Sequence, residues 1–92
     1  MRFKDKSLKR FWNTGRVKGI NPEHSDRLKE LLSALNAATK PGDMDLPGYA
    51  FHHLKGNRAG EFAVEISGPF RLVFEWHDGE AILVRPENYH GN

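Results

Sequence analysis

The second half of this 92-residue chain contains side chains that can carry acid–base and phosphate chemistry. Histidine titrates near neutral pH and can accept or donate a proton, arginine and lysine neutralise phosphate, and a tyrosine donates a hydrogen bond or stacks on a base. Cleavage of RNA by a 2′-hydroxyl needs such groups: a base, a cation for the charge developing on phosphorus, and an acid for the departing 5′-oxygen. The candidates are His52, Lys55, Arg71, Tyr89 and His90.

Other chemistries find less support in the sequence. The chain contains no GxxxxGK phosphate loop, no GxSxG elbow, no HExxH helix and no GxGxxG fingerprint. Adjacent strand residues such as His52 and His53 point to opposite faces, and no spacing collects three or four ligands, so we expect no metal and no cofactor. A structural alternative stays open for Arg71, which can form a surface ion pair with Glu65, Glu75 or Glu80.

Two helices are predicted before these residues. Ser7 can cap a short helix from Leu8 to about Thr14, which Gly15 ends. A second helix begins at Asn21 and Pro22 and ends near residue 38. The apolar residues at helical spacing are Leu8, Phe11 and Trp12 in the first helix, and Leu28, Leu31, Leu32 and Leu35 in the second.

The later residues follow a period of two, which predicts strands. We expect strands at residues 50–54, 62–67, 70–77 and 80–85, with Asp78-Gly79 as a hairpin turn, and a short edge strand at residues 2–4. The predicted fold is an α+β domain of order β-α-α-β-β-β-β, with both helices on one face of an antiparallel sheet. Alternation places Arg71 on the opposite face from Phe70, Leu72 and Phe74.

Composition and charge limit the class of protein. The chain has 38% hydrophobic residues and no cysteine, which predicts one domain over residues 1–92 without disulfides. Its apolar runs are too short for a membrane span, so we expect a cytoplasmic protein without a membrane partner. Seven basic residues and one acidic residue fall within residues 1–18, a balance typical of polyanion binders, although a solvated helix face is the alternative. The residues expected to contact a polyanion are Lys6, Lys9, Arg10, Arg16, Lys18 and, from a later turn, Arg58.

Three sequence motifs together resemble one family over nearly the whole chain. They are the Leu-Lys-Gly-Asn-Arg-x-Gly turn at residues 54–60, the Phe-Arg-Leu-x-Phe strand at residues 70–74, and the terminal Glu-Asn-Tyr-His at residues 87–90. In this order they resemble the HigB-type toxins of the RelE superfamily, the toxin halves of bacterial type II toxin–antitoxin pairs.

The resemblance implies a small RelE-like fold and a ribosome-dependent endoribonuclease, an mRNA interferase that cuts messenger RNA in the ribosomal A site. It implies as partners the 70S ribosome, mRNA and a cognate helix-turn-helix antitoxin of the HigA type, in the bacterial cytoplasm. It implies that His52 and His90 are the acid–base groups and that Lys55 and Arg71 contact the scissile phosphate. The family's terminal acidic-Tyr-His element falls on Asn88, Tyr89 and His90.

Asn88 departs from the family pattern, which often has aspartate at this position. An asparagine cannot act as a base or charge-stabilise an imidazolium. Glu87 can replace that carboxylate only from the same face, and regular strand alternation would turn it to the opposite one. One alternative is therefore a degenerate toxin with weak activity. A separate alternative from the same superfamily is a ParE-like inhibitor that binds DNA gyrase without chemistry of its own.

Overall fold

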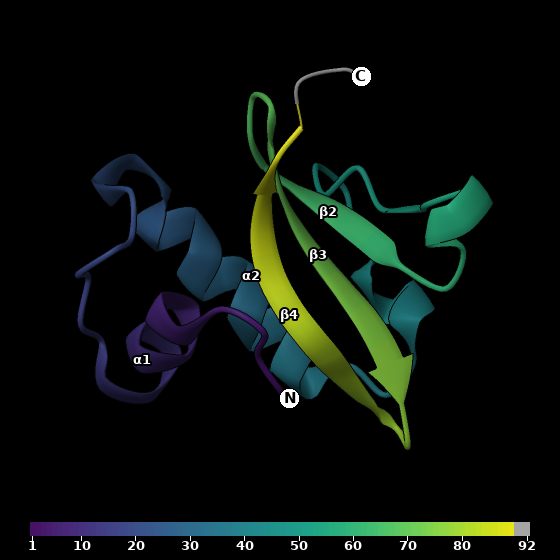
Figure 1. The fold of residues 1–92 in the computed structure, drawn as a ribbon, viewed down its shortest axis with the longest axis horizontal. Coiled ribbons are helices and arrows are strands. Elements are labelled where there is room, and N and C mark those ends of the chain that lie inside the picture. Colours follow the sequence, from purple (N-terminus) through teal and green to yellow (C-terminus); the bar gives the residue numbers. More distant parts are fainter. Residues whose placement is uncertain (90–92) are drawn as a thin grey trace.

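The computed structural model describes residues 1–89 and contains two helices on one face of a four-stranded antiparallel sheet (Figure 1). The helices are α1 (Lys6–Thr14) and α2 (Ser25–Ala37), and the sheet order is β1-β2-β3-β4. The strands are β1 (His52–His53), β2 (Phe62–Ser67), β3 (Phe70–His77) and β4 (Glu80–Asn88). Three short 3₁₀ turns are Pro22–His24, Pro41–Met44 and Gly56–Arg58. The predicted α+β class and its layering are confirmed.

Helix α1 begins earlier than its sequence predicts. Asp5 is the N-cap, and its carboxylate accepts a hydrogen bond of 2.7 Å from the Leu8 backbone N–H. The prediction of Ser7 as the cap is therefore wrong: Ser7 lies inside the helix, where its Oγ would clash with a Cβ added at Gly19. Gly15 ends the helix with φ +77°, as predicted.

The core lies between the helices and the sheet. Asn21 caps the 3₁₀ turn that leads into α2, whose four regularly spaced leucines are buried as predicted. They pack with the α1 residues Leu8 and Phe11 against one face of the sheet. The sheet residues of this core are Val64, Ile66, Leu72, Phe74, Ala81 and Val84. Within residues 1–89, no helix is long and apolar enough to cross a membrane.

The first and last strands differ in length from their predictions. Strand β1 has two residues instead of five, and Ala50 at φ +50° lies outside the extended region. The predicted edge strand at residues 2–4 is a single parallel bridge from Phe3 to Val84. Strand β4 continues through Pro86 to Asn88. The Val84 backbone N–H donates a hydrogen bond to the Arg2 carbonyl, on the outer edge of β4. The backbone nitrogen of Pro86, two residues later, faces the same outer edge, so its missing N–H costs no hydrogen bond within the sheet.

A β-bulge in β4 decides which side chains face away from the core. The β3–β4 register shifts between Val73↔Arg85 and Glu75↔Ile82, and Leu83 lies in the shift with φ +52°. One extra residue reverses the alternation, so Val84 joins the core and Arg85 faces the opposite side of the sheet. Glu87, two residues later, shares the side of Arg85.

We expect Asp5→Ala to lower the free energy of unfolding by about 1 kcal/mol, because the first turn of α1 loses its side-chain cap. Ser7→Ala is the control, since it leaves the Asp5–Leu8 hydrogen bond in place. Urea denaturation of both variants measures the difference. Equal losses in the two variants would contradict the assignment of Asp5 as the cap.

Candidate active site

The helix-free face of the sheet carries an open groove of about 530 Å³. It brings together five of the six residues assigned to catalysis from the sequence: His52, Lys55, Arg71, Asn88 and Tyr89. The sixth, His90, lies outside the described residues. The remaining lining residues are His53, Leu54, Arg58 and Glu87.

His52 is exposed and held by one backbone contact. Its Nδ1 lies 2.9 Å from the carbonyl oxygen of Ala50. Because a carbonyl only accepts, this contact assigns the ring proton to Nδ1 and leaves Nε2 of the neutral ring as a proton acceptor. His53 pairs with Phe62 across the strands, and its ring packs edge-on against the Phe62 ring at 4.9 Å. The two histidines therefore differ in environment, and His52 is the one suited to proton transfer.

Arg71 is the most enclosed cation of the groove, with a side chain 13% exposed. Its guanidinium lies over the Tyr89 ring, 4.3 Å from the centroid, and its Nη2 donates a hydrogen bond of 3.2 Å to Glu87. Its Nε is buried and has no hydrogen-bond partner within residues 1–89. A buried donor without a partner is costly, so the Arg71 guanidinium is incompletely hydrogen-bonded within the described residues.

The Arg71–Tyr89 pair also borders a second hollow of about 270 Å³. His52 lines both hollows, so these three residues stand between them. Lys55 is exposed at the start of the 3₁₀ turn and makes no ion pair inside the described range 1–89. The groove therefore offers an unpaired ammonium beside a partly paired guanidinium.

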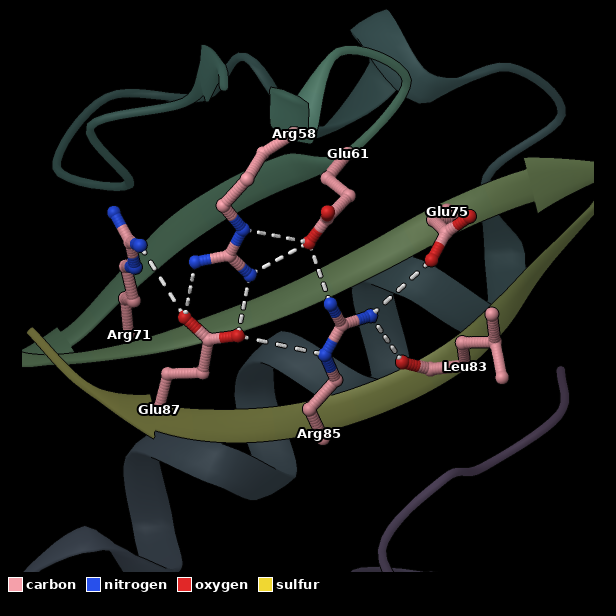
Figure 2. A network of polar contacts seen from close by, with 7 residues as sticks. All are labelled: Arg58, Glu61, Arg71, Glu75, Leu83, Arg85 and Glu87. Carbon is pink, nitrogen blue, oxygen red and sulfur yellow. Dashed lines mark hydrogen bonds and ion pairs between the residues drawn. The ribbon is translucent and has the colours of Figure 1, made fainter. Parts of the chain in front are cut away.

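Three arginines and three glutamates form a network along this face (Figure 2). Arg58 contacts Glu87 through two hydrogen bonds, of 2.9 and 2.5 Å, and reaches Glu61 at 2.6 Å. Arg85 bonds Glu61 at 2.5 Å and lies 3.6 Å from both Glu75 and Glu87. The formal charges of the network sum to zero.

The network corrects two expectations about Glu87. The partner of Arg71 is Glu87, and not Glu65, Glu75 or Glu80. Glu87 pairs with Arg71 in the strand register and faces the groove, so the expectation that alternation turns it away is wrong. Asn88 pairs with Phe70 in the strand register and also lines the groove.

Glu61 and Arg85 had no role in the prediction from sequence, and Glu75 was named only as a candidate partner of Arg71. The last strand was predicted from the Asp78-Gly79 turn, and its residues 81–84 are all apolar, so no alternation there could locate a bulge. Arg58 was grouped from the sequence with the RNA-binding residues. In the structure it belongs to this network, where its guanidinium donates hydrogen bonds to Glu61 and Glu87. The five other basic residues of that group are exposed on α1 and the loop after it, without an ion pair among residues 1–89.

Hydrogen bonding within the network changes the acidity of its carboxyl groups. The bonds from Arg58 lower the pKa of Glu87 to about 2; burial opposes this effect and Arg71 adds to it. Arg58 likewise lowers the pKa of Glu61. Glu87 is therefore ionised at neutral pH and too weak a base to accept a proton from a hydroxyl. It cannot replace the missing aspartate as a proton acceptor.

The low pKa of Glu87 predicts acid sensitivity. A carboxyl with a pKa of about 2 when folded and 4.5 when unfolded stabilises the fold above pH 4.5, and this contribution is lost as the pH falls toward 2. We expect the unfolding free energy of the parent to fall more steeply between pH 4.5 and 2 than that of Glu87→Gln. Urea denaturation across this range measures both slopes, and equal slopes would contradict the prediction.

Comparisons with known proteins identify the family. A family model described as the RelE-like toxin of type II toxin–antitoxin system HigB matches residues 1–87. The chain is 32% identical over 88 residues to the protein named Endoribonuclease HigB from Proteus vulgaris, covering 96% of each chain. It is 33% identical over 84 residues to the protein named Toxin HigB-1 from Vibrio cholerae serotype O1, covering 89% of this chain and 88% of that one. A toxin of this kind acts within a pair that includes an antitoxin. With the groove, the fold and these matches in agreement, the chain belongs to the HigB family of RelE-like toxins.

Proposed function

We propose that this protein is a ribosome-dependent endoribonuclease that cuts messenger RNA in the ribosomal A site. The observation that carries the proposal is the groove, where a histidine with a free Nε2, an exposed lysine and a partly exposed arginine lie together. A relative at 32% identity named an endoribonuclease supports the same activity.

In the proposed reaction, the 2′-hydroxyl attacks the adjacent phosphorus and the bond to the 5′-oxygen breaks. His52 Nε2 takes the hydroxyl proton, and a 2′,3′-cyclic phosphate forms as the 5′-oxygen leaves. Arg71 and Lys55 neutralise the charge that develops on the phosphoryl oxygens. Tyr89 holds the Arg71 guanidinium by stacking, and His90, which follows it in the sequence, protonates the departing oxygen.

His52→Ala and Arg71→Ala test these roles. We expect each to slow cleavage at least 100-fold, since each removes a group that acts in the transition state. The measurement is 5′-end mapping of message in a translating extract, with His77→Ala as a control because His77 is 72% exposed at the far end of β3. Cuts in phase with codons are expected only when ribosomes are present. Ribosome-independent cutting by the parent would overturn the ribosome requirement, and undiminished cutting by either variant would overturn its role.

The exposed basic residues of α1 and the following loop are proposed as the surface that docks on ribosomal RNA. Their charges are unpaired within residues 1–89, whereas the arginines of the sheet face are neutralised by glutamates. The two sets of cations are therefore suited to different tasks, docking and catalysis. The antitoxin partner is proposed to be a helix-turn-helix protein of the HigA type.

Replacing Lys9, Arg10 and Lys18 by glutamine should weaken ribosome binding and reduce its salt dependence, because fewer counterions are released from the RNA. Replacing Lys29 and Lys40, which are exposed outside this segment, is the control. Binding to purified ribosomes over a range of salt concentrations gives the slope for each variant. An equal change in slope per charge removed in both variants would show that only the overall charge matters.

A further inference from the structure

Glu87 contacts the catalytic arginine while being held by two others. Arg58 binds its carboxylate through both oxygens, Arg85 Nε lies 3.6 Å from Oε2, and Arg71 Nη2 bonds Oε1 at 3.2 Å. The Glu87 side chain is 25% exposed, so it is largely removed from water. Its position is therefore fixed from three sides, and the longest of its hydrogen bonds is the one to Arg71.

The three arginines differ in how many of their donors are used. Arg58 places Nε, Nη1 and Nη2 on carboxylates, and Arg85 places Nη1 on the Leu83 carbonyl and Nη2 on Glu61. Arg71 makes one hydrogen bond to a side chain, and its Nε has no partner among the described residues. Arg71 is thus the arginine of this face with donors left for a ligand, and Glu87 fixes one edge of it.

We propose that Glu87 is a positioning residue, which orients Arg71 for the scissile phosphate and at the same time weakens RNA binding through its negative charge. This inference rests on the proposed function and deepens it. The carboxylate holds one edge of the guanidinium, Tyr89 covers its face, and the remaining edge is left for the phosphoryl oxygens. A fixed cation stabilises the transition state without reorganising during the reaction.

The two effects of Glu87 oppose each other in a measurable way. A neutral residue at this position removes the repulsion between carboxylate and phosphate, so RNA binds more tightly. The same change leaves Arg71 less firmly oriented, so the chemical step slows. A merely structural residue would not produce tighter binding together with slower cleavage.

Glu87→Gln is the central test, and Glu75→Gln is its matched control. Both raise the charge of the same face by one unit, but the ion pair of Glu75 is with Arg85 and not with Arg71. Glu87→Gln should bind a trinucleotide blocked by a 2′-deoxy group about threefold more tightly. Its single-turnover cleavage on programmed ribosomes should be at least tenfold slower. Glu75→Gln should cleave at the parental rate, and unchanged cleavage by Glu87→Gln would overturn the proposal.

Glu87→Asp tests the position of the carboxylate without changing its charge. It also replaces Glu87→Gln as the test if that variant fails to fold. It keeps the negative charge but shortens the reach to Arg71, so cleavage should slow while affinity for the blocked trinucleotide stays the same. Parental cleavage by a folded Glu87→Asp would contradict the positioning role.

A double variant shows whether Glu87 acts through Arg71. In an Arg71→Ala background, Glu87→Gln should cause no further loss of cleavage. A full additional loss would assign Glu87 a role independent of Arg71.

A spectroscopic measurement tests the Glu87–Arg71 contact independently of RNA cleavage. The ¹⁵N-detected Nε–H signal of Arg71 should broaden or shift in Glu87→Gln without any RNA, and stay parental in Glu75→Gln. If the parent cleaves no RNA but these signals behave as expected, the proposed function fails while the positioning contact stands. An active parent whose Arg71 signal is unaffected by Glu87→Gln would overturn the inference alone.

Discussion

The cross-strand pairing of Arg71 with Glu87 is the contact on which the candidate site depends. It joins the start of β3 to the end of β4 and brings Tyr89 over the guanidinium. The contact exists because the bulge at Leu83 reverses the alternation of β4, and the bulge is tied to the same network by the bond from Arg85 to the Leu83 carbonyl. A leucine at positive φ costs about 1–2 kcal/mol. The network therefore supports a locally strained backbone whose effect is to place an acidic side chain beside Arg71.

The two faces of the sheet are stabilised by different physical means. The helix side buries leucines and aromatic residues against α1 and α2. On the opposite side, Ala63 and Val73 are fully buried although no helix covers them. These two residues are cross-strand partners, and Val73 also pairs with Arg85 on β4. The arginine and glutamate side chains lie over this small apolar strip, and their aliphatic stems exclude water from it while their charges pair. A small domain can thus leave one face open for a ligand without exposing an apolar surface.

The elements with regular periodicity could be predicted from the sequence. The four leucines of α2 and the alternation in β2 and β3 determine their burial directly, and the same alternation placed Arg71 on the helix-free face. Two of the errors arose where one backbone residue departs from regularity: Leu83 at positive φ reversed the side of Glu87, and Ala50 at positive φ shortened β1. A single alanine or leucine in the left-handed region cannot be recognised from the sequence, because tertiary contacts and not the residue type hold it there.

The neutrality of the sheet face has a consequence for how a small basic protein can act on RNA. If Arg58, Arg71 and Arg85 were all unpaired, the groove would attract any phosphate backbone, since a non-specific affinity grows with the number of neutralised phosphates. The three glutamates offset those charges, and Lys55 is left as a groove cation without an ion pair among residues 1–89. On the function proposed above, recognition then depends on the exposed cations of α1 and its loop, which lie outside the groove. An enzyme arranged in this way holds RNA weakly at its reactive groups until another surface has positioned it, and this arrangement suits a nuclease whose substrate is presented by a larger assembly.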